Sequence, residues 1–117
     1  MQGALVGLMN TSNGTGTTAQ SARTNVGFFN PNDNPTSVAL ELRDDNGTVL
    51  GNQIVVLAPF QQAQLSLIGA SGLFPNVSGD VVTATIFFIA GSPLFTYASI
   101  VDNVSGDGSF VLPSKTD

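Results

Sequence analysis

The sequence predicts an all-β fold, a single antiparallel β-sandwich of seven or eight strands. Short apolar runs recur along the chain, and clusters of Gly, Pro, Asn and Asp separate them, which is the pattern of strands joined by turns. Two pairs of runs, residues 38–50 and 81–101, are each interrupted by a tight turn, as expected for β-hairpins. No segment keeps a helical apolar period beyond one turn, so we expect essentially no helix.

The length of the chain indicates one domain. At 117 residues it can bury a single core and leaves no room for a second one, so residues 1–117 are expected to form one β-sandwich.

The first half of the chain is expected to form four strands, at residues 2–9, 21–30, 36–43 and 48–57. The alternation is clearest in the third, where Val38, Leu40 and Leu42 occupy one face. Asn46-Gly47 is the dipeptide favoured in a two-residue type I′ hairpin turn. The Gly51-Asn52 pair predicts either a break or a bulge in the fourth strand.

The second half is expected to add strands at residues 61–68, 81–89, 94–101 and 110–112. Residues 81–89 and 94–101 are apolar at both odd and even positions, so they should be the central strands. Phe87 and Ile89 cannot share the core with Phe88. We expect that second apolar surface to be covered by a loop or offered to a neighbour.

Several side chains are expected to fill the core. Leu40, Leu65 and Ile86 lie at inward positions of their strands. Leu73 and Phe74 lie in a Gly- and Pro-rich segment between two strands, and we expect them to close one end of the sandwich.

The low and acidic charge of the chain limits its partners. Charged residues make up 9% of the sequence, and 3 cations face 8 carboxylates for a net charge of -5. A surface of this sign repels nucleic acid and supplies few phosphate contacts. The apolar stretch at residues 3–9 is far shorter than the roughly 20 residues of a membrane span and has no basic flank, so neither membrane insertion nor a signal peptide is expected.

The residue types that most often carry catalysis are scarce. The chain has no His and no Cys, so a hydrolytic triad has no base, and neither a thiolate nor a disulfide can form. The Asp44-Asp45 pair falls in a hairpin turn, where aspartate is favoured for its own backbone hydrogen bonds. We therefore expect no enzymatic activity and no cofactor.

Carboxylates in the expected loops leave a calcium site as an alternative, because calcium takes oxygen ligands from loops. No run matches the spacing of an EF-hand loop, so we interpret these residues as solvated turn carboxylates and expect no metal. They are Asp33, Asp44, Asp45, Asp102 and Asp107.

Three segments carry a recognisable combination of residues. They are Arg-Thr-Asn-Val-Gly-Phe-Phe-Asn-Pro at 23–31, Leu-Arg-Asp-Asp-Asn-Gly-Thr-Val-Leu-Gly at 42–51, and Tyr-Ala-Ser-Ile-Val-Asp-Asn at 97–103 with Gly106-Asp107 and Phe110-Val111 after it. Together, over residues 5–113, they resemble an immunoglobulin-like β-sandwich repeat of secreted and cell-surface proteins of environmental bacteria. The resemblance implies an immunoglobulin-like fold and an extracellular or cell-surface location, and it implies no catalytic or binding residue. The sequence departs from the repeat at Ala22, where an aromatic residue is usual.

Arg23 is placed inside the second expected strand. A buried or half-buried guanidinium needs a carboxylate partner. In the arrangement that the resemblance implies, Asp102 ends a neighbouring strand, so we predict a structural clamp between Arg23 and Asp102.

Two functions are compatible with these observations. The first is a non-enzymatic extracellular structural or adhesive module, a homo-oligomer or one unit of a tandem array, which follows from the two-faced apolar strands and the nearly uncharged surface. The alternative is a carbohydrate-binding or targeting module of a secreted hydrolase. Sugar-binding surfaces rely on exposed aromatic rings, and the chain has no Trp and one tyrosine, Tyr97, inside a central strand.

The N-terminal strand offers a route to self-assembly. Residues 1–9 are apolar on both faces, with Ala4, Leu5, Val6 and Leu8 as the candidate assembly residues, and the polar segment 10–20 follows them. If this strand is donated to the next copy, head-to-tail exchange propagates a filament. The alternative is an ordinary first strand that pairs within its own chain.

Overall fold

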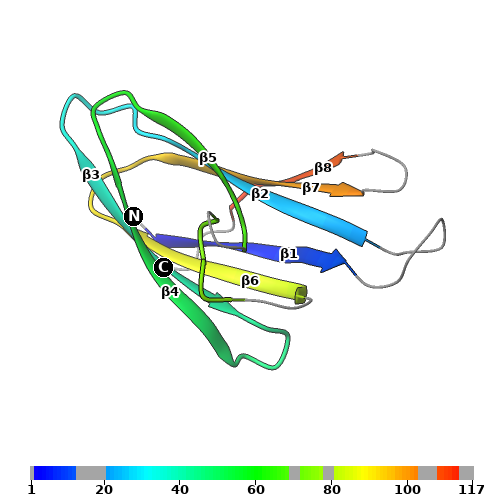
Figure 1. The fold of residues 1–117 in the computed structure, drawn as a ribbon. Coiled ribbons are helices and arrows are strands. Elements are labelled where there is room, and N and C mark those ends of the chain that lie inside the picture. The colour runs from blue at the N-terminus through cyan, green and yellow to red at the C-terminus, as the bar shows by residue number, and fades with distance from the viewer. Residues whose placement is uncertain (1, 13–20, 69–71, 78–80, 103–107, 114–117) are drawn as a thin grey trace.

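The computed structural model consists of eight β-strands (Figure 1). It describes residues 2–12, 21–68, 72–77, 81–102 and 108–113. The strands are β1 Gln2–Ser12, β2 Ser21–Phe29, β3 Thr36–Arg43, β4 Val49–Leu57, β5 Gln62–Ser66, β6 Val81–Ala90, β7 Phe95–Asp102 and β8 Gly108–Val111. Within this described part we find no helix that is long and apolar enough to cross a membrane.

The strands form two four-stranded antiparallel sheets around one core. Sheet A has the order β4-β3-β6-β1, and sheet B has the order β5-β2-β7-β8. Buried apolar side chains from both sheets meet between them, so the predicted β-sandwich is confirmed. The most deeply buried include Leu5, Leu8, Val26, Phe28, Val38, Leu42, Leu57, Leu67, Ile86 and Ala98.

The predicted central strands are confirmed, but they do not form a hairpin with each other. β6 lies between β3 and β1, and β7 lies between β2 and β8, so both edges of each strand are already paired. The connection at residues 91–94 instead carries the chain from sheet A to sheet B, with Leu94 buried at the crossing. Gly91 N–H donates to the Ser37 carbonyl at 3.0 Å and fixes the exit from β6.

β1 belongs to both sheets (Figure 1). Its first part, Gln2–Asn10, pairs with β6, and its last two residues pair with Ala22 and Ser21 of β2. The register shifts on both sides of Leu8, and Gly7 adopts a φ of 76°, which favours glycine. Because bulges bend a strand, β1 reaches the second sheet and ends at Ser12, beyond the end expected at residue 9.

A buried threonine holds this bend. Met9 lies within the second register shift and is not among the residues paired with β6. Thr24 of β2 is fully buried, donates its hydroxyl to the Met9 carbonyl, and accepts a hydrogen bond from Met9 N–H at 3.3 Å. Its side chain therefore supplies backbone partners at the point where the strand ladder is interrupted.

The β3–β4 hairpin turns over three residues, so the predicted type I′ turn is wrong. Asp44 N–H donates to the Thr48 carbonyl at 3.0 Å, and Gly47 N–H donates to the Asp44 carbonyl at 3.1 Å. Within this turn the positive φ is confined to Gly47, at 83°, whereas a type I′ turn needs it at Asn46 as well. The Asp44 carboxylate accepts hydrogen bonds from the backbone of Asn46 and Thr48, each at 2.9 Å, and this favours the longer turn.

Gly51 lies beside the irregularity in β4 and contacts the segment that was predicted to close one end of the sandwich. The β3–β4 register shifts at Leu50, so the strand has an irregularity one residue before the predicted Gly51-Asn52 pair, and both residues of that pair are themselves paired with β3. Leu73 and Phe74 are buried, as expected. A Cβ atom on Gly51 would lie 3.2 Å from the side chains of Phe74 and Val77, so the small residue lets this segment pack closely on β4.

Two of the three expected core positions are confirmed. Leu40 and Ile86 are buried, whereas Leu65 is half-buried and packs at the border of the core. The expectation for Leu65 is wrong because β5 is an edge strand, paired with β2 on one side. A side chain there lies at the rim of the sandwich.

Asn30 organises the loops beyond β2 and is fully buried. Its Nδ2 donates to the carbonyls of Asn34 at 2.9 Å and Ala58 at 3.0 Å. Its Oδ1 accepts from the backbone N–H of Asn32 at 3.0 Å and from Asn32 Nδ2 at 2.8 Å. One amide thus ties the turn after β2 to the connection between β4 and β5.

Candidate functional site

The carboxylates do not gather into a site in the part of the chain that the structure describes. No group of three or more His, Cys, Asp or Glu residues lies together there. Asp44 is engaged in its own turn, and Asp33 and Asp45 are exposed. The side chains of Asp102 and Asp107 lie outside the described residues.

The premise of the predicted clamp is wrong, because Arg23 is exposed and needs no buried partner. The backbone of Arg23 pairs with Val101, one residue from Asp102, whose side chain is outside the described set. The clamp between Arg23 and Asp102 stays a prediction. The neighbouring Thr24 makes a different link, from β2 to the Met9 carbonyl of β1.

The predicted assembly strand, β1, completes the core of its own chain. Ala4 is buried, and Leu5 and Leu8 are fully buried, whereas Val6 is exposed. The strand lies at an edge of sheet A, since its pairing partner in that sheet is β6.

Exposed apolar side chains gather on the outer side of sheet A, and we call this surface the apolar face. It consists of Ala39, Ile54, Val56, Phe87 and Ile89. Cross-strand register places Ala39 of β3 between Ile54 of β4 and Ile89 of β6. Ile54, Val56 and Ile89 are 66%, 65% and 58% exposed, so the apolar surface that the sequence predicted on β6 is uncovered and extends to β4.

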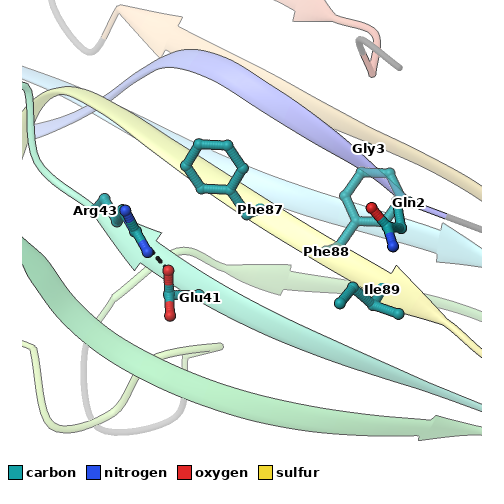
Figure 2. Close-up of a pocket in the computed structure, with 7 residues that line it drawn as sticks. All are labelled: Gln2, Gly3, Glu41, Arg43, Phe87, Phe88 and Ile89. Atoms are coloured by element: carbon teal, nitrogen blue, oxygen red, sulfur yellow. Dashed lines mark hydrogen bonds and ion pairs between the residues drawn. The ribbon is translucent and has the colours of Figure 1, made fainter. Parts of the chain in front are cut away.

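A shallow depression lies at one end of the apolar face (Figure 2). It is lined by Gln2 and Gly3 of β1, Glu41 and Arg43 of β3, and residues 87–89 of β6. The Arg43 guanidinium carbon lies 5.4 Å from the centroid of the Phe87 ring, and Arg43 Nε donates to the Glu41 carboxylate. The two charges therefore neutralise each other at the border of the face and leave its centre uncharged.

The free edge of β4 is protected. Ile54 N–H donates to Gln53 Oε1 at 3.0 Å, and Gln53 Nε2 donates to the Leu73 carbonyl at 3.0 Å. The Gln53 side chain thus already binds the Ile54 N–H, a backbone donor that an added strand would need. We therefore expect another molecule to contact the face of sheet A rather than this part of its edge.

The outer side of sheet B carries a different set of side chains, which we call the aromatic face. Its rings are Phe29 of β2, Phe95 and Tyr97 of β7, and Phe110 of β8. The ring centroids of Phe29 and Phe95 are 6.2 Å apart with an interplanar angle of 22°, and those of Tyr97 and Phe110 are 6.1 Å apart at 55°.

Tyr97 lies flat across the sheet. A Cβ atom on Gly27 would lie 2.2 Å from its ring, so the ring rests on the backbone of β2. Its hydroxyl donates to Gln64 Oε1 on β5, two strands away, at 3.4 Å. Tyr97 is in a central strand, as predicted. It belongs to the aromatic face, which the sequence pattern did not predict.

Amide and hydroxyl side chains border these rings. Cross-strand register places Gln62 beside Phe29, and Asn25 between Ser66 and Ser99. Arg23 is the charged side chain on this face within the described residues.

The comparisons with known proteins concern the fold. The chain is similar to the structure titled "Crystal Structure of Thermotoga maritima 1070", with a TM-score of 0.66 and 10% sequence identity over 97% of this chain and 89% of that one. No protein-family model matches, and no curated protein matches in sequence. At this identity the likeness shows a shared two-sheet antiparallel β-sandwich and nothing of function.

Proposed function

We propose that this protein is a non-enzymatic extracellular structural module that associates with copies of itself through the apolar face of sheet A. The observation that carries the proposal is the exposure of Ile54, Val56 and Ile89 on one continuous sheet surface. Contiguous exposed apolar surface is typical of interaction sites, because removing it from water is favourable.

A second copy can meet the apolar face without bringing unpaired like charges together. Two chains of net charge -5 repel each other in general. The charges that border this face, on Arg43 and Glu41, form a neutral pair and add nothing to that repulsion. A two-fold contact then places apolar side chains on apolar side chains.

An extracellular or cell-surface location is supported by the resemblance to the immunoglobulin-like repeat and by a surface covered mainly with uncharged polar groups. Donor-strand exchange of residues 1–9 is a second mode of assembly. It is supported by the edge position of β1 and by the core side chains Leu5 and Leu8, which a neighbouring copy would have to receive.

Sedimentation equilibrium over a wide concentration range tests the first mode. We expect the full chain to form dimers or larger species, and Ile54→Thr/Ile89→Thr to be monomeric, since Thr keeps strand propensity and removes apolar contact. The matched control is Phe95→Thr/Phe110→Thr on the opposite face, which should assemble like the parent chain. A parent chain that stays monomeric at the highest concentration contradicts the proposal.

A disulfide distinguishes the second mode. Gln2 of β1 pairs with Ile89 of β6, both side chains are exposed, and the parent chain has no cysteine, so the two thiols of Gln2→Cys/Ile89→Cys can be oxidised selectively. Pairing within one chain gives a monomer on a non-reducing denaturing gel. A ladder of covalent oligomers is the result that donor-strand exchange predicts.

A further inference from the structure

We propose that the aromatic face of sheet B binds a neutral polysaccharide. This goes beyond the proposed function, because it concerns the opposite side of the sandwich and a ligand of another class. The four rings Phe29, Phe95, Tyr97 and Phe110 and the amides of Gln62, Gln64 and Asn25 lie on one surface of adjacent strands.

The chemistry of this surface matches that of a sugar ring. A pyranose has a face of C–H groups and a rim of hydroxyl groups. Aromatic rings offer an apolar surface for the C–H face, while amide side chains donate and accept hydrogen bonds at the rim. The apolar face of sheet A, in contrast, places aliphatic side chains side by side at its centre, and its amides, Gln2 beside Ile89 and Asn52 beside Glu41, lie on strands at opposite margins of the sheet.

The position of Tyr97 is built into the sheet. Because Gly27 has no side chain, the ring lies against the backbone and turns its other side outward, half-exposed. The hydrogen bond to Gln64 holds the far end of the ring above β5. A ring that is held flat before binding loses little conformational entropy when a ligand stacks on it.

The charge of the face selects against ionic ligands. Apart from Arg23 near its end, the described residues on this face carry no charge, so neither a polyanion nor a polycation finds complementary groups. Because the rings lie on three adjacent strands, the face suits an extended chain of sugars that contacts several rings in turn.

Pull-down with insoluble cellulose, chitin and mannan, followed by calorimetry with soluble oligosaccharides of the retained polymer, tests the proposal. We expect retention by at least one polymer. Tyr97→Ala should lower the affinity by about tenfold or more, and Phe110→Ala by a few fold, as expected when aromatic contacts are lost. Tyr97→Phe should keep most of the affinity, because the ring stays.

Gly27→Ala is the most selective variant. It removes none of the proposed ligand-contacting side chains but displaces the Tyr97 ring, so it should weaken binding about as much as Tyr97→Ala. Phe87→Ala, on the other face, is the control and should bind like the parent chain. Circular dichroism of each variant tests whether it is folded. Phe110 is 75% exposed, so its truncation is not expected to disturb the fold. No retention, or retention that Tyr97→Ala and Phe110→Ala leave unchanged, overturns the proposal.

Discussion

The two outer faces of the sandwich are built from the same strand alternation and differ in what surrounds their apolar side chains. On sheet A, aliphatic residues from β4, β3 and β6 lie side by side, and a neutral Arg43–Glu41 pair borders them. On sheet B, aromatic rings alternate with amide and hydroxyl side chains, and Tyr97 is held flat over Gly27. Exposed apolar area alone therefore does not identify a partner. We infer the partner of each face from the polar groups that border its apolar side chains.

Truncating the shared core should damage both faces together. Ile86 is fully buried, so Ile86→Ala should lower the free energy of unfolding by about 2–5 kcal/mol through lost burial and a residual cavity. Denaturant unfolding measures this. Ile89→Ala on the same strand is the control and should change stability far less, because Ile89 is exposed. Equal effects of the two variants would show that the faces of β6 are wrongly assigned.

Asn30→Ala should disturb one face of the sandwich more than the other. Removing the amide leaves the carbonyls of Asn34 and Ala58 without this donor, at a cost of about 1–3 kcal/mol. Because Asn30 directly follows Phe29, we expect the aromatic face to be disturbed more than the apolar face. Thermal unfolding and the NMR spectrum of the variant report these two effects. Changes concentrated at Ile54 and Ile89 would be contrary to this account.

Thr36→Val should stabilise the protein and leave both faces unaltered. The Thr36 hydroxyl is buried and makes no hydrogen bond with the described residues, so replacing it with a methyl group should increase the free energy of unfolding by about 1 kcal/mol. Ser37→Ala, at the exposed next position, is the control. A loss of stability in Thr36→Val would mean that the hydroxyl has a partner.

The face variants should have the smallest effect on folding. Ile54→Thr/Ile89→Thr and Phe95→Thr/Phe110→Thr change exposed positions, so each should alter stability by about 0.5 kcal/mol or little more. Ile54→Thr/Ile89→Thr should abolish assembly and keep polysaccharide retention, and Phe95→Thr/Phe110→Thr should keep assembly and weaken retention. A double variant that unfolds the protein would reveal a structural role for its face.

Strand positions were predictable because they depend on local patterns. The alternation in β3 gave its bounds and its buried residues Val38, Leu40 and Leu42 correctly. The turn type at Asn46-Gly47 was missed because the Asp44 side chain decides it through two hydrogen bonds. The half-buried position of Leu65 depends on β5 being an edge strand, which a sequence pattern does not reveal.

The candidate sites were less predictable because they arise from pairing between distant segments. Phe87 and Ile89 were expected to present apolar surface, and their neighbour Ile54 is brought beside them only through β3. The aromatic face joins Phe29, Tyr97 and Phe110 across three strands. Gly27 and Tyr97 are both visible in the sequence, but their pairing, which lets the ring lie flat on the sheet, depends on the register of β2 and β7.

Concentration-dependent NMR spectra of the uniformly labelled full chain test whether the protein associates with itself through the apolar face. As the protein is concentrated, we predict that amide signals shift around Ala39, Ile54 and Ile89 on sheet A, while those around Tyr97 and Phe110 on sheet B stay in place. Spectra that do not depend on concentration, or shifts confined to the aromatic face, would contradict the assignment of self-association to the apolar face.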